Sequence, residues 1–104
     1  MASILVAPCV EEKLWEIWEF IARDNSEAAT RVIEAAKATF KTLAENPALG
    51  RKRHFKNRRL RDVRSWQVAG FENYVIFYRG LPAGIEVIHV YHGARDIDSL
   101  FGQE

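Results

Sequence analysis

The sequence lacks most of the features that identify secreted, membrane or metal-binding proteins. It contains one cysteine, Cys9, which cannot form an intramolecular disulfide, and this favours a reducing cytosol. No apolar run approaches the roughly 18–20 residues that span a bilayer, and the first residues lack the basic stretch of a signal peptide. Metal-ligand spacings, a phosphate-binding glycine loop and a Ser-His-Asp signature are also missing. We therefore expect a soluble, cytoplasmic protein that uses neither a metal nor a cofactor.

The composition predicts one globular domain with an uneven distribution of charge. The 104 residues are 48% apolar, which is enough to build a single core over residues 1–104. The net charge is only +1, but residues 1–50 carry −3 and residues 51–104 carry +4. The segment from Arg51 to Arg64 holds eight basic residues and one acidic residue, a charge of +7. This asymmetry indicates a polyanionic partner, either a nucleic acid or an acidic polypeptide.

The first half of the sequence predicts a strand followed by two helices. Ser3 to Ala7 is a short apolar run, and Pro8 suits the first turn of a helix. Apolar residues recur at helical spacing from Val10 to Arg23 and again in the segment that follows Ser26. Ser26 is the expected N-cap of the second helix, and Asn46-Pro47 should end it. The short connection between the helices predicts an antiparallel helical hairpin.

The second half predicts an antiparallel sheet. We interpret Leu49 to Asn57 as a basic loop, and three segments have strand composition: Leu60 to Val68, Glu72 to Arg79 and Ile85 to His92. Near-continuous apolar runs in the last two predict burial on both faces, by the hairpin on one side and by a partner on the other. The order β-α-α-β-β-β predicts an α+β fold, in which a short N-terminal strand and the helical hairpin accompany a mostly antiparallel sheet of three to four strands.

Several stretches resemble the RelE/ParE toxin superfamily. The matching stretches follow the family order over nearly the whole chain: Glu16 to Ala22, Ala28 to Arg31, Leu43 to Pro47 with Gly50-Arg51, Leu60-Arg61, Tyr74 to Arg79, and His92 to Asp96. The last two, Tyr-Val-Ile-Phe-Tyr-Arg and His-Gly-Ala-Arg-Asp, resemble the ParE branch more than the ribonuclease branch. The resemblance implies the toxin component of a type II toxin–antitoxin module.

The resemblance implies growth arrest that a cognate antitoxin neutralises. ParE-like toxins inhibit DNA gyrase without an established catalytic activity, and this is the function we favour. The alternative is a RelE-like endoribonuclease that cuts mRNA on the ribosome without a metal, and a third possibility is an inactive member that only binds antitoxin. Family antitoxins are largely disordered and fold on binding, so their acidic and apolar residues would cover the +7 segment and a groove between helices and sheet. Operator DNA would be bound only indirectly, through the antitoxin.

The ribonuclease alternative assigns roles to four residues by their position in the family pattern. His54 or His92 would transfer protons, and Arg61 and Arg79 would hold the phosphate with bidentate contacts. The sequence departs from that pattern because no tyrosine follows His92. Strand alternation also places Tyr91 and His92 on opposite faces of the sheet, so the two should not act together.

For either function we expect one set of residues to contact the target or the antitoxin. The set is Arg51, Lys52, Arg53, Lys56, Arg58, Arg59, Arg61, Arg79, His92 and Arg95. Simpler structural interpretations compete with functional ones at several positions. His89, which alternates with Val87 and Tyr91, is expected to be a packed histidine, and the three tryptophans are expected to be core or interface anchors. Cys9 is interpreted as an inert small hydrophobe, Arg95-Asp96 could simply pair, and the role of His92 stays open.

Overall fold

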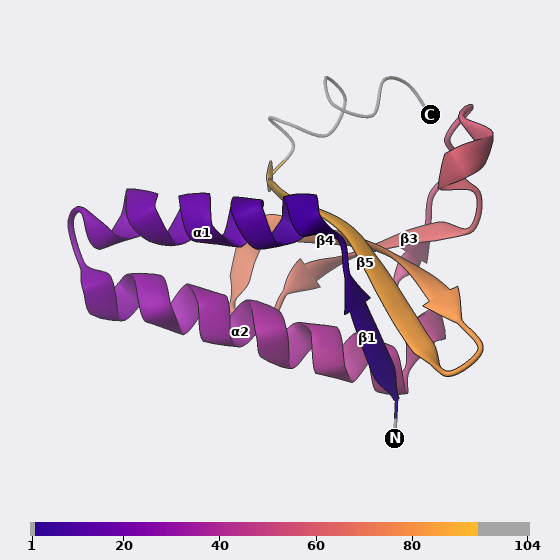
Figure 1. Ribbon diagram of the computed structural model, residues 1–104, viewed down its shortest axis with the longest axis horizontal. Helices are drawn as coiled ribbons and strands as arrows, with labels where there is room; N and C mark the ends of the chain where they lie inside the picture. Colours follow the sequence, from indigo (N-terminus) through magenta and orange to yellow (C-terminus); the bar gives the residue numbers. More distant parts are fainter. Residues whose placement is uncertain (1, 94–104) are drawn as a thin grey trace.

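Two long helices follow a short N-terminal strand in the computed structural model, which describes residues 2–93 (Figure 1). These first elements are β1 at Ser3–Val6, α1 at Pro8–Ala22 and α2 at Ser26–Glu45. Pro8 occupies the first turn of α1, as predicted, where no N–H donor is needed. The predicted cap of α2 is wrong by one residue. Asn25 is the N-cap, and its side-chain oxygen accepts a 3.0 Å hydrogen bond from the Ala28 N–H, whereas Ser26 already lies inside the helix.

The rest of the described chain forms a sheet and two short 3-10 turns. In chain order these elements are the turn η1 at Pro47–Leu49, β2 at Arg51–Lys52, the turn η2 at Arg58–Leu60, β3 at Val63–Val68, β4 at Phe71–Leu81 and β5 at Gly84–His92. The strands are arranged in the order β1-β5-β4-β3-β2. Only the pairing of β1 with β5 is parallel, since the other three neighbouring pairs are antiparallel. The mostly antiparallel α+β fold is therefore confirmed.

The described residues form five strands, so the prediction of three to four was too low. The predicted basic loop contains a short strand, because Arg51 and Lys52 pair with Ser65 and Arg64 of β3. Leu60 was predicted to begin a strand but belongs to η2, and β3 begins three residues later. A two-residue strand without apolar alternation has no periodic pattern in the sequence, and only its partner strand identifies it.

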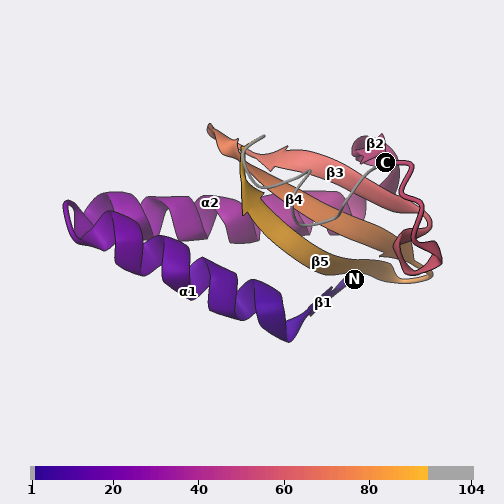
Figure 2. The same ribbon diagram turned by 90° about the horizontal axis from the view of Figure 1, so that it is seen from above.

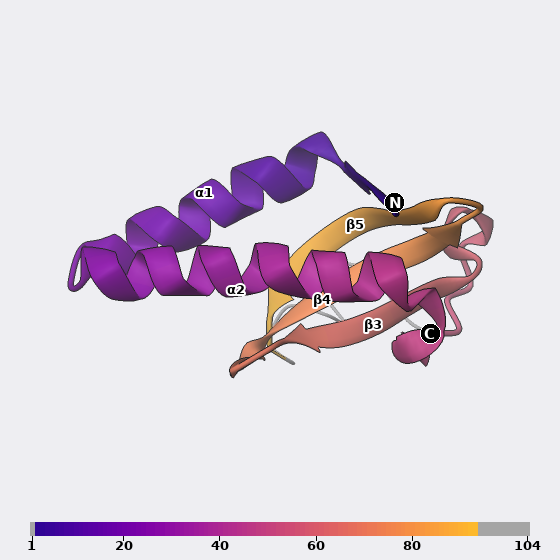
Figure 3. The ribbon, with the colours of Figure 1, turned by 90° about the horizontal axis from the view of Figure 1, so that it is seen from below.

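Both helices lie on the same face of the sheet, and the tip of the helical hairpin extends beyond it (Figures 1 and 3). Helix α2 contacts β3, β4 and β5, whereas α1 contacts β5. The main core between these layers contains the following buried residues: Val10, Leu14, Ile17, Val32, Ala36, Phe40, Leu43, Ala44, Val68, Ile76, Tyr78, Ile85, Val87 and Val90. The apolar stripes predicted for both helices thus face the sheet and each other.

A second, smaller core lies on the opposite face of the sheet. Val63, Phe77 and Tyr91 are buried there, and Phe55 and Leu60 from the segment before β3 pack against them. Burial on both faces of the sheet, predicted from the apolar runs, is confirmed. However, the cover on this second face includes residues of the chain's own basic loop, where we had predicted only a partner.

A bulge in β5 changes which residues share a face. Phe77 pairs with His89 but Tyr78 pairs with Val87, so Ile88 is an extra residue in β5. Val87 consequently belongs to the core under the helices, whereas His89 stacks on Tyr91 with ring centroids 5.1 Å apart. The predicted alternation of Val87 with His89 and Tyr91 on one face is therefore wrong at Val87.

The fully buried Tyr78 ties β4 to the end of α2 and to the start of the basic loop. Its hydroxyl donates a 2.8 Å hydrogen bond to the Pro47 carbonyl and accepts a 2.7 Å bond from the Gly50 N–H. Burial raises the pKa of Tyr78, although the Gly50 bond and nearby Arg64 act in the opposite direction. A Cβ on Gly50 would lie 2.4 Å from this hydroxyl, so the contact requires glycine at position 50.

We predict that Tyr78→Phe lowers the free energy of unfolding by about 1–3 kcal/mol, because two backbone groups lose their partner. Gly50→Ala should also be destabilising because it displaces the ring. Gly80→Ala is the matched control, since its Cβ would meet only the Pro47 Cβ at an ordinary 3.6 Å. Urea denaturation measures all three, and a Tyr78→Phe midpoint equal to that of the unchanged protein would contradict the assignment.

Candidate functional site

Five of the basic residues predicted for the site gather around one cleft in the loop between β2 and β3. The residues that line this cleft, of about 310 Å³, are Lys52, Arg53, His54, Phe55, Lys56, Leu60, Arg61 and Asp62. Figure 2 shows the loop at the end of the sheet farthest from the tip of the helical hairpin. We call residues 51–61 the cationic loop. The structure thus brings together five of the predicted residues at a single concave surface.

Apolar and backbone contacts hold the cationic loop on the sheet. Phe55 packs against Phe77 with ring centroids 6.1 Å apart, and the Arg53 N–H donates a 2.9 Å bond to the Val63 carbonyl. Asp62, directly after the loop, has a φ of 63°, a left-handed conformation that is uncommon except in glycine, asparagine and aspartate. The cleft therefore has an anchored apolar side and a rim of cations.

Two arginines of the sheet donate hydrogen bonds to backbone carbonyls within the cationic loop or directly before it. The Arg79 Nε donates to the Arg61 carbonyl at 3.3 Å, and one terminal nitrogen donates to the Arg59 carbonyl. The other terminal nitrogen lies 3.6 Å from the Glu86 carboxylate. Arg64 donates in the same way to the Gly50 carbonyl at 2.7 Å. Arg79 is therefore placed to hold the loop in shape, a role that the sequence analysis did not include: it gave Arg79 as a target contact and, in the ribonuclease alternative, as a phosphate ligand.

The other predicted basic residues lie outside this cleft. Arg51 lines a neighbouring cleft over β3 with Ser65, Trp66, Gln67 and Val75, and Arg53 borders both clefts. Arg58 and Arg59 lie in η2 and are exposed. Arg95, and with it the possible pair with Asp96, lies outside the described residues.

His92 is separated from the cationic loop. It is paired with Tyr74, whose ring meets it edge-on at 5.1 Å between centroids. Tyr74 packs against the main core under the helices, whereas Tyr91 belongs to the core on the other face, so the predicted opposition of Tyr91 and His92 is confirmed. Arg79 is five residues along β4 from Tyr74, which corresponds to ~17 Å. His92 and Arg79 therefore do not converge on one reacting group.

His89 and Cys9 lie beside each other where α1 passes β5. The Cys9 thiol donates to the Ile88 carbonyl at 3.4 Å and lies 3.8 Å from the His89 Nδ1. Burial lowers the pKa of His89, which agrees with a packed histidine. Cys9 is a free, exposed cysteine, and its interpretation as an inert small hydrophobe stays a prediction.

An exposed aromatic surface lies on α1. Trp15 and Trp18 stack with ring centroids 5.7 Å apart, and 62% of Trp15 is exposed. Trp66 is 36% exposed. The exposure of Trp15 excludes the core role for this residue, and the role of interface anchor stays a prediction. The sequence already indicated that Trp15 would be exposed, because it falls outside the apolar stripe of Val10, Leu14 and Ile17.

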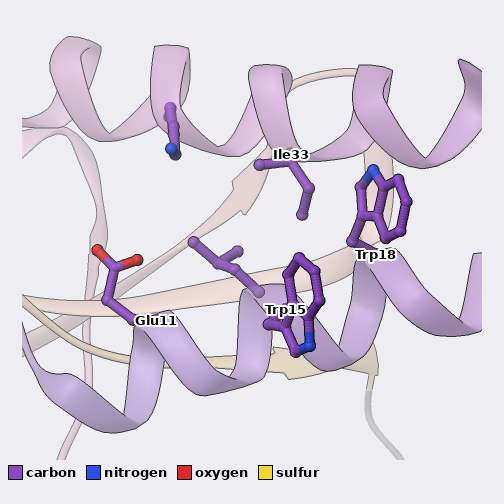
Figure 4. Close-up of a pocket in the computed structure, with 6 residues that line it drawn as sticks. Glu11, Trp15, Trp18 and Ile33 are labelled. Carbon is purple, nitrogen blue, oxygen red and sulfur yellow. The ribbon is translucent and has the colours of Figure 1, made fainter.

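An apolar groove lies beside the stacked rings, along the helical hairpin. Figure 4 shows the two indole rings beside Ile33, with Glu11 at the other end of the groove. The Trp18 Nε1 donates a 3.3 Å hydrogen bond to the Thr30 hydroxyl of α2, which fixes this ring between the helices. The lining residues, which enclose about 220 Å³, are Glu11, Leu14, Trp15 and Trp18 of α1 and Ile33 and Lys37 of α2.

Residues 2–93 contain no cluster of three or more histidine, cysteine, aspartate or glutamate side chains that could hold a metal ion. In the same part of the chain, neither helix combines the length and the apolar composition that a membrane span requires.

The chain is similar to one characterised family. A family model described as "ParE toxin of type II toxin-antitoxin system, parDE" matches residues 4–97. A solved structure titled "Chromosomal ParDE TA system from P. aeruginosa" has a chain with the same fold, at a TM-score of 0.70 and 15% sequence identity. That similarity covers 89% of this chain and 97% of the other. No curated protein matches the sequence.

We predict that Arg79→Gln loosens the cationic loop without unfolding the sheet. The amides of Leu60 and Arg61, bonded to the Asn57 and Arg58 carbonyls, should exchange with solvent about tenfold faster, equivalent to ~1.4 kcal/mol of local stability. Arg58→Gln, at an exposed position of the same turn, is the control and should leave these amides nearly unchanged. Unaltered exchange in Arg79→Gln would show that the loop does not depend on this guanidinium.

We predict that His89 makes the protein less stable at acidic pH. Because its pKa is lower in the folded state than in the unfolded state, the unfolded state binds more protons as the pH falls below about 6.5. Unfolding free energy should therefore drop between pH 7.5 and pH 5.5, and the drop should be smaller in His89→Gln. Urea denaturation at the two pH values measures it, and equal drops in both proteins would exclude the effect.

Proposed function

Because the chain belongs to the ParE toxin family of type II toxin–antitoxin systems, we propose that it arrests growth by binding and inhibiting DNA gyrase. The observation that carries this proposal is the shape of the cationic loop. Arg79 is bonded to two carbonyls of the loop, and Arg64 to the Gly50 carbonyl directly before it. The exposed arginines of this anchored loop form a charged surface that extends beyond the cleft. Such a surface fits a non-enzymatic inhibitor that recognises an acidic partner through several contacts at once.

The chemistry of the loop suits binding. Arg51, Arg58, Arg59 and Arg61 are exposed, and each guanidinium can donate paired hydrogen bonds to a carboxylate or phosphate. A loop that is already ordered loses less conformational entropy on binding than a mobile loop. We propose the full predicted set in the described chain as target-contacting, apart from Arg79, which positions the loop, and His92, which lies elsewhere.

One observation favours the ribonuclease as a second candidate. His54 and Arg61 line the same cleft as Lys52, so a proton-transferring group and two cations share one concave surface. The other two residues of that scheme do not join them, because Arg79 holds loop carbonyls and His92 lies at the far end of β5. Half of the proposed catalytic set is therefore missing from the cleft.

Membership of this family also leads us to expect an antitoxin partner and a cytoplasmic location. We propose that a cognate antitoxin binds this chain in the cytoplasm and that any contact with operator DNA runs through the antitoxin. The apolar and cationic surfaces described above would both be available to such a polypeptide.

Purified protein assayed with gyrase and with translating ribosomes separates the two candidates. We expect loss of supercoiling activity, or gyrase-dependent DNA breaks, and intact ribosome-bound mRNA. Replacing Arg58 and Arg59 with glutamate should weaken gyrase inhibition at least tenfold, because attraction becomes repulsion. Arg31→Glu with Lys41→Glu, on exposed positions of α2, is the control and should have little effect. Cleaved mRNA with unimpaired supercoiling would overturn the proposal in favour of the ribonuclease.

A further inference from the structure

A thiol and an imidazole meet where the first turn of α1 passes β5. Cys9 and His89 are 80 residues apart in the sequence, yet the Cys9 Sγ lies 3.8 Å from the His89 Nδ1. The thiol also donates a 3.4 Å hydrogen bond to the Ile88 carbonyl. Ile88 is the bulge residue of β5, so both partners of the thiol come from the place where this strand departs from regular pairing.

The thiol borders a small pocket that solvent can enter. Cys9 is exposed, so a reagent in solution can reach its sulfur. The pocket encloses about 220 Å³, roughly the volume of seven water molecules in the liquid, which is enough for a small organic molecule. Its lining includes Cys9, Glu12, Lys13 and Glu16 of α1 and His89 and Tyr91 of β5, none of which lines the cleft of the cationic loop.

His89 has the properties of a base that acts on this thiol. Its ring stacks on Tyr91 with 5.1 Å between centroids and 21° between planes, so its orientation is fixed. Burial lowers the pKa of His89, so the imidazole is neutral near pH 7 and one ring nitrogen can accept a proton. A nucleophile within reach of a base that a third group orients is the arrangement that activates cysteine side chains.

We propose that Cys9 and His89 form a thiol–imidazole pair that exchanges with small disulfides, which makes Cys9 a site of reversible modification. The Cys9 sulfur attacks one sulfur of the disulfide, so that a new S–S bond forms and the old one breaks. The His89 Nδ1 takes the thiol proton and returns it to the departing thiolate, which leaves as a free thiol. Excess small thiol reverses the exchange and restores Cys9. This proposal replaces the interpretation of Cys9 as inert, and it does not depend on the gyrase proposal.

The charges around the pocket select the kind of disulfide. Glu12 and Glu16 contribute two negative charges and Lys13 one positive charge, a balance of −1. A disulfide that carries carboxylates is therefore repelled, and one that carries ammonium groups is attracted. The ligand class is a small disulfide without net negative charge. A metal ion fits less well, because residues 2–93 hold no group of three histidine, cysteine, aspartate or glutamate side chains that could bind it.

The test follows formation of the mixed disulfide by mass spectrometry of the intact chain. The product identifies its own site, because Cys9 is the only cysteine. At pH 7 we expect the folded protein to react with cystamine at least about tenfold faster than the same chain unfolded in urea, where His89 no longer lies beside the thiol. Dithiodipropionate, a dicarboxylate of similar size, should react more slowly than cystamine with the folded protein. Equal rates for the folded and the unfolded chain would overturn the proposal.

The pH dependence of the rate identifies His89 as the base. An unassisted thiol reacts about tenfold more slowly at pH 6.5 than at pH 7.5, because only its thiolate attacks. The unchanged protein should slow less than about threefold, since His89 stays largely neutral over this range. The other titratable groups that line the pocket are the two carboxylates, the Lys13 amine and the Tyr91 phenol, types that titrate outside this range in free peptides.

Two matched variants complete the test. His89→Gln should show the full tenfold slowing between pH 7.5 and pH 6.5, whereas His92→Gln, three residues further along β5, should keep the shallow dependence of the unchanged protein. A shallow dependence in His89→Gln would overturn the role of His89. A tenfold slowing in the unchanged protein would overturn the pair as a whole, and this measurement needs no variant to fold.

Discussion

The hydroxyl of Tyr78 is the contact on which the arrangement of this molecule depends. It joins the middle of the sheet to the Pro47 carbonyl at the end of α2 and to the Gly50 N–H just before β2. Without that hydroxyl, the buried Gly50 N–H and the part-buried Pro47 carbonyl would need other partners. Because the cationic loop starts at Arg51, the position of its first cation follows from this buried hydrogen bond and from the lack of a side chain on Gly50.

The cationic loop carries many like charges that repel each other, and arginines of the sheet hold its backbone in place. Like charges packed into one short segment repel each other, and an unsupported loop would extend into solvent. Arg79 donates to two of its carbonyls and Arg64 to the Gly50 carbonyl directly before it, so both arginines bind backbone and not the charged side chains of the loop. Glu86 balances part of the added charge. The guanidinium groups of the sheet thus order a segment that is itself positively charged.

The molecule has two surfaces of different character at different places. The cationic loop lies at one end of the sheet, and the apolar groove lies along the helical hairpin. Charge governs encounter with a partner and its specificity, whereas burial of an aromatic anchor slows its release.

The sequence by itself determined the helical hairpin, the α+β class, the separation of Tyr91 from His92 and the charge of the loop, because each depends on local periodicity or composition. Tertiary structure decided the rest. The pairing of β2, the bulge at Ile88 and the turn of Arg79 toward the Arg59 and Arg61 carbonyls all depend on residues distant in the chain. The groove at Trp15 likewise exists only where α1 meets α2, since a helix pattern shows which residues avoid the core but not which of them a second helix will border.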